Sequence, residues 1–260
     1  MSFDIGRALR DGFDRATARN AALAALLLLG LRLVNRVTGD SFAERFLVDV
    51  VEYRQVLADI RAQADQPIQD PFVDSFPFAV LDLPVAVLGA LAVALFVAGL
   101  VVDIGLLRTF TGEERRTLPV ENFTRNLGWT VLRLFAGTVL YFLAVAVGLI
   151  FLVVPGIYLA VALFFYNYEI VVAQKGVFDA FGGSLDLTAG ERLPLFLLGL
   201  VFAVLGSVTS LALGQAFPTG TVPGAVAQIV VAVAVTVFGL TVAARAYVQL
   251  RTASREVPQR

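Results

Sequence analysis

The sequence has 260 residues, 58% of them hydrophobic, and a formal net charge of −1. Ordinary soluble domains are about 45–50% apolar, and a net charge near zero excludes a global field that attracts nucleic acid. The absence of Cys and His excludes disulfides, thiolate chemistry and the commonest general base and transition-metal ligand. We therefore expect no catalytic residue, no metal and no cofactor. The apolar residues are gathered into long runs, which is typical of membrane spans.

The N-terminal part of the chain predicts a helix at the membrane surface followed by a first span. In Ser2–Asn20 apolar and charged residues alternate at helical spacing, as in interfacial helices. The apolar run Ala21–Val37 follows. Because its leading segment is long and mixed in charge, and no small-residue cleavage site follows it, we expect a retained span rather than a signal peptide.

Residues 38–77 form the only long polar segment and are predicted to be an extracytoplasmic amphipathic loop. Apolar residues recur at helical spacing from Phe46 onward, which predicts an amphipathic helix over Ser41–Ala64. Three prolines between positions 67 and 77 end any helix beyond it.

The remaining apolar runs predict five further spans. Leu134–Tyr168 has 35 residues without a charge, which is too long for a single crossing of about 20 residues. Pro155 and Gly156 inside that run predict a reversal between two helices. The fold is therefore predicted to be all-α, with one polytopic membrane domain over residues 1–260 and amphipathic interfacial helices. The six predicted spans are 21–37, 84–107, 127–154, 157–173, 193–213 and 224–248.

The distribution of basic residues predicts the orientation in the membrane. One side would hold 13 Arg and Lys residues, whereas the other holds four Arg together with eight carboxylates between Asp40 and Asp74. Cytoplasmic loops carry the excess of Lys and Arg. The sequence therefore predicts a protein of the cell membrane with both termini in the cytoplasm and the lipid bilayer as its surroundings.

Four ionisable residues are predicted to lie in the cytoplasmic third of the bilayer, roughly 5–9 Å from its inner boundary at helical rise. Charges in a membrane are costly and usually face the bundle interior and pair. We interpret the group as an interhelical latch that pairs Asp103 with Arg133 and Glu169 with Arg245. The alternative is a site for a substrate or a proton, to which Asn167 would add a polar contact. The candidate cluster is Asp103, Arg133, Asn167, Glu169 and Arg245.

The stretch from position 155 to 190 carries the most specific motif: P-G-I-Y, an apolar helix, then G-x-x-x-A-x-x-x-S-L-x-L-T-x-G. It resembles the membrane domains attached to some glycerophosphoryl diester phosphodiesterases and their stand-alone relatives. Leu185 replaces the usual Trp of that pattern and Ala189 a usual Lys. The resemblance implies about six helices and no agreed activity. The matching residues include Pro155, Gly156, Tyr158, Gly176, Ser184, Thr188 and Gly190.

Three functions fit these observations. The preferred one is a non-enzymatic membrane domain that organises lipid or a partner, either a phospholipid or a membrane or soluble protein. A small-molecule or ion transporter is the first alternative, motivated by the intramembrane charges. A membrane enzyme acting on lipid headgroups is the second, suggested only by the family association. No nucleic-acid partner is expected.

Overall fold

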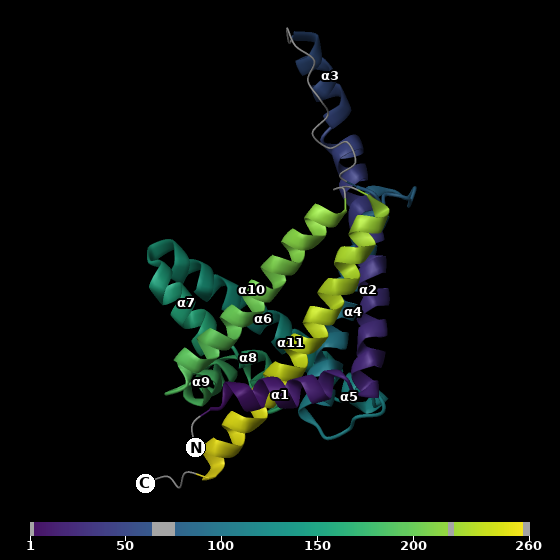
Figure 1. Ribbon diagram of the computed structural model, residues 1–260. Coiled ribbons are helices and arrows are strands. Elements are labelled where there is room, and N and C mark those ends of the chain that lie inside the picture. Colours follow the sequence, from purple (N-terminus) through teal and green to yellow (C-terminus); the bar gives the residue numbers. More distant parts are fainter. Residues whose placement is uncertain (1–2, 64–75, 218–220, 257–260) are drawn as a thin grey trace. The chain divides into compact units, whose positions relative to one another are not determined.

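The computed structural model describes residues 3–63, 76–217 and 221–256. Within these ranges the regular structure is helical, with no strand, and six helices are long and apolar enough to cross a membrane (Figure 1). The predicted all-α polytopic fold is therefore confirmed. The six candidate spans are Arg19–Val50, Val85–Thr111, Leu127–Phe151, Val153–Val171, Arg192–Ala216 and Val222–Ser254.

Eleven α-helices and one π-helical turn follow one another in the described residues. They are α1 (Ile5–Ala16), α2 (Arg19–Arg45), η1 (Phe46–Val50), α3 (Tyr53–Gln63), α4 (Val85–Thr111), α5 (Val120–Thr124), α6 (Leu127–Phe151), α7 (Val153–Ala162), α8 (Tyr166–Val171), α9 (Val177–Leu187), α10 (Arg192–Ala216) and α11 (Val222–Glu256). The chain divides into two compact units. Unit 1 comprises Met1–Leu26, Gly99–Gly206 and Ala234–Arg260, and unit 2 comprises Leu27–Ala98 and Ser207–Val233.

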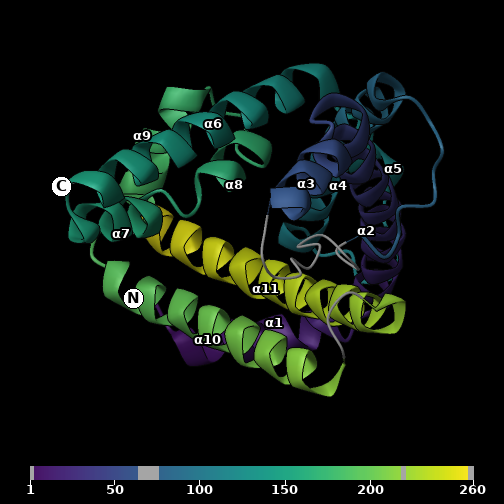
Figure 2. The same cartoon turned by 90° about the horizontal axis from the view of Figure 1, so that it is seen from above.

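Helices α6 to α9 form one half of unit 1. They lie together in both views of the ribbon (Figures 1 and 2), and α6 contacts α7, α8 and α9. The buried aromatic rings of Phe165, Tyr168 and Tyr247 connect α8 to α11, with centroids 5.0 to 5.7 Å apart. Many other large apolar side chains of the spans, above all on α6 and α10, are exposed, as expected for helices whose outer faces meet lipid.

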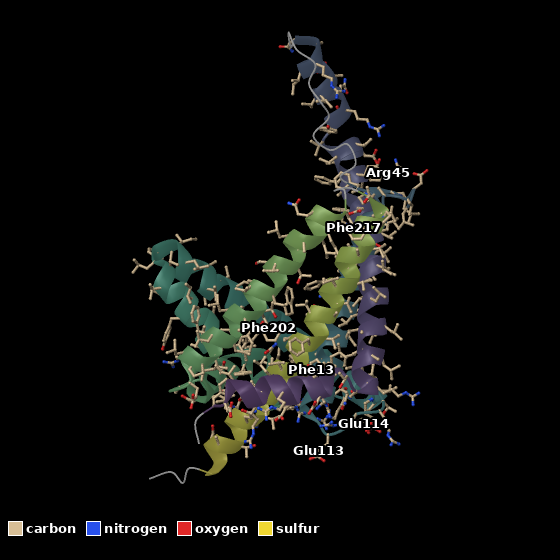
Figure 3. The ribbon with its side chains drawn as sticks, viewed as in Figure 1. Phe13, Arg45, Glu113, Glu114, Phe202 and Phe217 are labelled. Carbon is tan, nitrogen blue, oxygen red and sulfur yellow. The ribbon has the colours of Figure 1, made fainter. Side chains whose placement is uncertain are left out.

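The helix α1 is held against α11 by a close backbone approach. Its N-terminus is capped by Asp4, whose carboxylate accepts from the backbone N–H of Arg7 at 3.0 Å. A Cβ added to Gly12 would lie 2.8 Å from the Cα of Val242. Phe13, labelled in Figure 3, is 60% exposed. The predicted N-terminal amphipathic helix is thus present, packed by its small residues.

The α6–α7 hairpin differs from the prediction in the position of its reversal. The chain turns at Leu152, which has extended backbone angles, and Pro155 lies in the first turn of α7. Proline is tolerated there because the first N–H groups of a helix have no partner in the helix. Gly156 supplies space rather than an unusual φ, since a Cβ on the facing Gly148 would lie 2.8 Å from the Gly156 Cα.

In unit 2 the first span is longer than predicted. Because residues 38–45 contain no proline, α2 runs on through Arg45 into η1, and the predicted helix over Ser41–Ala64 is divided between α2, η1 and α3. Glu52, with φ of +49°, separates the last two. Ala64 itself and the prolines at 67 and 71 lie outside the described residues.

Polar side chains near the end of α2 hold the extended segment that precedes α4. The buried carboxylate of Asp40 pairs with Arg36 at 3.0 Å and accepts from the backbone N–H of Phe78 at 3.2 Å. Ser41 Oγ accepts from the backbone N–H of Leu81 at 3.1 Å. Arg45, labelled in Figure 3, forms an ion pair with Asp82. These contacts account for the burial of Asp40 and Ser41, which the sequence had placed in a polar loop.

Candidate functional site

A buried carboxylate is the centre of the polar contacts in unit 1. The side chain of Glu169, on α8, is only 5% exposed. Its Oε2 lies 2.5 Å from Lys175 Nζ, and its Oε1 accepts from the Tyr247 hydroxyl at 2.8 Å. Arg251 Nη1 lies 3.9 Å from Oε1 and also donates to the Tyr247 hydroxyl. Two cations and one hydroxyl therefore compensate the buried charge of Glu169.

The local chain path brings Lys175 back to Glu169. After α8 the chain turns through Gln174, which has φ of +60°, and the backbone N–H of Lys175 donates to the Glu169 carbonyl at 3.1 Å. Gly183 of α9 leaves room for the pair, because a Cβ there would lie 2.6 Å from Glu169 Oε2. The Glu169–Lys175 ion pair therefore depends on the turn at Gln174 and on the small size of Gly183. A hydropathy analysis of single spans detects neither.

The predicted pairing of Glu169 with Arg245 is wrong. Successive residues of a helix are rotated by about 100°, so Arg245 projects about 200° away from Tyr247, whereas Arg251 is one turn beyond Tyr247 on the same face. Arg245 Nη2 instead donates to the carbonyls of Phe110 at 2.6 Å and Gly112 at 3.2 Å. The prediction compared only the depths of Glu169 and Arg245 in the membrane. It did not consider the direction in which Arg245 points from α11.

The other predicted cluster members lie elsewhere in unit 1. Arg133 donates to the carbonyl of Gln174 at 3.4 Å, and its guanidinium lies 5.8 Å from the centre of the Trp129 ring. Asp103 is exposed on α4. Asn167 Oδ1 accepts from the backbone N–H of Tyr168 at 2.9 Å. The pairing of Asp103 with Arg133 stays a prediction.

The motif residues Ser184 and Thr188 support a break in the fourth span. Between Ala162 and Tyr166 the helix is interrupted. Ser184 Oγ donates to the Ala162 carbonyl at 3.0 Å and accepts from the backbone N–H of Phe165 at 3.1 Å. Thr188 Oγ1 lies 3.1 Å from the same Ala162 carbonyl, and both hydroxyl side chains are fully buried. Inside a membrane each backbone polar group needs such a partner.

Ser184→Ala is expected to lower the free energy of unfolding by about 1–3 kcal/mol, because it leaves the buried N–H of Phe165 without an acceptor. Thermal or denaturant unfolding in detergent measures the change. The matched control is Ser210→Ala, since Ser210 is exposed on α10 and should respond by less than about 0.5 kcal/mol. Equal responses of the two variants would contradict the role given to Ser184.

Other motif residues have local structural roles. Tyr158 of α7 lies under the guanidinium of Arg192, at the start of α10, with 4.8 Å from the guanidinium carbon to the ring centre. Gly176 is the N-cap of α9, and Gly190 has φ of +82°, which favours glycine. The motif therefore describes a folded substructure of α7, α8 and α9 and not a set of converging reactive groups.

Two arginines hold the C-terminal end of α4. Arg15, on α1, is 1% exposed and donates to the carbonyls of Thr109 at 3.0 Å and Gly112 at 2.7 Å. Arg245 donates to the neighbouring carbonyls described above. The last carbonyls of a helix lack partners within it and carry partial negative charge, so cations stabilise them. Burial, with Arg245 and Arg115 nearby, lowers the pKa of Arg15 to about 10.

Arg108 donates hydrogen bonds to three further backbone carbonyls. It is 7% exposed, and it donates to the carbonyls of Val171 at 3.3 Å, Asn122 at 2.9 Å and Arg125 at 2.8 Å. Its Nη2 donates to Thr130 Oγ1 at 3.3 Å. Arg108 thereby ties α4 to the ends of α5 and α8, while its positive charge meets only neutral acceptors in these bonds.

A pocket of about 470 Å³ lies beside Arg108 and the Tyr247–Arg251 pair. Three arginines line it, and none of its lining residues among those the structure describes is acidic. It is built from α4, α5 and the end of α11, together with single residues that directly follow α4, α5 and α8. The lining residues are Arg108, Thr111, Gly112, Asn122, Arg125, Val172, Tyr247, Val248, Arg251 and Thr252. The described residues contain no group of three or more acidic, Cys or His side chains placed to hold a metal.

The sequence-based cluster missed Lys175, Tyr247, Arg251 and Arg108. Lys175 is the only lysine in the chain, a signal that sequence analysis could have weighed. Tyr247 and Arg251 are four residues apart, a spacing that predicts a shared helix face. For Arg108 the sequence offers no comparable signal, because its partners are backbone carbonyls.

Comparison with known proteins identifies a family but no characterised relative. No curated protein and no solved structure matched the chain. Residues 3–250 match the family described as a domain of unknown function, DUF7847. The match spans nearly the whole chain and includes all the residues of the arginine-lined pocket except Arg251 and Thr252. The chain therefore belongs to the DUF7847 family.

Proposed function

We propose that this multi-pass membrane protein is a non-enzymatic membrane domain that organises anionic lipid around unit 1. The observation that carries the proposal is the arginine-lined pocket, whose described lining has three cations and no carboxylate. Lipid headgroups carry phosphate, and arginine is over-represented wherever phosphate is recognised. A basic pocket among transmembrane helices is a known kind of site for anionic headgroups.

The contacts of Glu169 favour a structural role over transport. Its carboxylate is held by Lys175, which precedes α9, and by Tyr247 and Arg251, which lie one turn apart on α11. A buried ion pair with additional hydrogen bonds fixes the arrangement of helices. The motif resemblance to membrane domains of glycerophosphoryl diester phosphodiesterases is consistent with a lipid environment and assigns no reaction.

The proposal predicts that anionic lipid is retained selectively. The protein should be purified from membranes in mild detergent and examined by native mass spectrometry, followed by reconstitution into nanodiscs of phosphatidylcholine with 20% or so phosphatidylglycerol. Enrichment of the anionic lipid over its share of the bulk bilayer is the expected result. A lipid composition identical to the bulk, in both measurements, would refute the proposed function.

We infer from the arginine distribution that the pocket faces the cytoplasm. The start of α1 and the end of α11 lie at the same end of unit 1 (Figure 1), as both termini on one side of the membrane require. The chain has no native Cys, so single-cysteine variants report position without background. Gln63→Cys should react with an impermeant maleimide in intact cells, and Ser254→Cys only after lysis. The reverse pattern would place the termini outside.

A further inference from the structure

We propose that the pocket binds a phosphate oxyanion through the guanidinium groups of Arg125 and Arg251, with Arg108 supplying a fixed third charge. The inference rests on the proposed function in one respect only, which is that the phosphate belongs to a lipid. The chemical recognition itself is independent of that source. It follows from the charge of the pocket, from the donors that remain available in it and from the acceptors that it lacks.

The positive charge of the pocket is only partly compensated at short range. Its three arginines line a volume of about 470 Å³, and no described lining residue is acidic. The nearest carboxylate described above, that of Glu169, is engaged by Lys175 at 2.5 Å and lies 3.9 Å from Arg251 Nη1. An anion in the pocket therefore meets a positive potential, in a space within the roughly 300–1,000 Å³ that is usual for small-molecule sites.

Most polar groups of the lining are already used. Asn122 Nδ2 donates to Thr109 Oγ1 at 3.0 Å. The hydroxyls of Thr111 and Thr252 donate to carbonyls of their own helices, at 2.8 and 2.9 Å. Tyr247 donates to Glu169. These side chains shape the pocket and most of their donors are engaged, although Asn122 keeps a second amide N–H.

Two guanidinium groups remain available. Arg125 is exposed, and within the described part of the chain its side chain makes no hydrogen bond or ion pair. Arg251 uses Nη1 for Tyr247, which leaves its Nε and Nη2 groups for a ligand. Arginine presents its N–H groups in a planar fork that matches two oxygens of a phosphate. Most of the five N–H donors of Arg108 already bond to carbonyls and to Thr130. Arg108 therefore contributes positive charge to the pocket, but no free pair of donors for the phosphate.

The described lining offers no cage of carboxylates or aromatic rings, and this narrows the chemical class of the ligand. Recognition of choline or ethanolamine requires carboxylates or several aromatic faces around the ammonium group, and the pocket offers three cations and the single ring of Tyr247. The ligand is therefore a phosphate whose remaining substituent is neutral or anionic. A lipid of the phosphatidylglycerol type and a free phosphate ester share that chemistry.

Tyr247 is a positioning residue in this arrangement. Its hydroxyl donates to Glu169 and accepts from Arg251, so it fixes the position of an arginine that lines the pocket. The ring of Tyr247 also lies 5.5 Å from the Arg251 guanidinium carbon. The Nη1 group of Arg251 is therefore held beside Tyr247 and Glu169, while its Nε and Nη2 groups stay available to a ligand.

The test compares three charge-neutralising variants in nanodiscs of phosphatidylcholine with and without phosphatidylglycerol. Arg125→Gln and Arg251→Gln each remove one proposed ligand group, and Arg10→Gln removes an exposed arginine of α1 as a control. Loss of a charge-assisted hydrogen bond corresponds to about a tenfold or greater loss of affinity. We expect each pocket variant to weaken phosphatidylglycerol binding about tenfold, and the control to bind as the wild type. Because Arg125 is exposed, its variant should keep the wild-type melting temperature, which separates binding from folding.

Inorganic phosphate and glycerol 1-phosphate, added to the protein in neutral detergent, distinguish the two sources. Binding of the soluble phosphates that is lost in Arg125→Gln, without enrichment of phosphatidylglycerol, would support the pocket and overturn the lipid-organising function. Phosphatidylglycerol enrichment that is equal in wild type and both pocket variants would overturn the pocket and leave the proposed function standing. Binding of neither probe would overturn both.

Discussion

Lys175→Met is expected to lower the free energy of unfolding in detergent by about 3 kcal/mol, at the lower end of the 3–5 kcal/mol typical of a broken buried ion pair. The carboxylate of Glu169 would stay buried with its closest cation gone. The lower end applies because Lys175 is 38% exposed and Arg251 remains 3.9 Å away. Reversible thermal or denaturant unfolding, followed by the fluorescence of Trp129, provides the measurement.

The double variant Glu169→Gln/Lys175→Met is the decisive comparison. Removing both charges removes the uncompensated one, so the double variant should be more stable than the sum of the two single losses predicts. A parallel cycle of Glu169→Gln with Arg245→Gln should be additive, since Arg245 bonds to the carbonyls of Phe110 and Gly112. Additivity in the Glu169/Lys175 cycle would show that the ion pair does not contribute to stability.

Gly148→Ala is expected to cost about 2–3 kcal/mol by forcing α6 and α7 apart, the upper range for overpacking. The added methyl would lie 2.8 Å from the Cα and 2.9 Å from the N of Gly156. Both are backbone atoms, so no side-chain rotation relieves the contact. The loss should appear as a lower melting temperature in detergent.

Gly199→Ala is the matched control for that substitution. Gly199 also lies within a membrane helix, α10, but nothing lies within 4 Å of the Cβ that alanine would add. Alanine is more favourable than glycine in a helix interior by about 1 kcal/mol. Gly199→Ala should therefore leave the protein as stable as the wild type or more stable. A loss in Gly199→Ala equal to that in Gly148→Ala would mean that close packing of the hairpin is not the cause.

The sequence was sufficient for the all-α fold and for the number of spans, because long uncharged runs have few physical alternatives in a chain of this composition. It was insufficient for the turn at Leu152. Proline is equally compatible with a loop and with the first turn of a helix, and only packing of Gly148 on Gly156 decides between them.

The candidate site was predictable to a smaller degree. The sequence marked Glu169 as a charge in need of a partner, because a carboxylate inside a membrane is costly whatever the fold. Its partners were not identified, since Lys175 returns through a turn with φ of +60° at Gln174 and Arg251 was expected beyond the last span. Arg108 and Arg15 bind backbone carbonyls, whose positions exist only in the folded chain.

The interruption between α7 and α8 has a consequence for the order in which the protein can be made. The carbonyl of Ala162 and the N–H of Phe165 find their partner in Ser184, which is synthesised about 20 residues later. While that serine is still inside the ribosome, the fourth segment enters the bilayer with two backbone groups unpaired, at a cost of several kcal/mol each. We therefore expect the fourth segment to insert stably only after α9 has been synthesised.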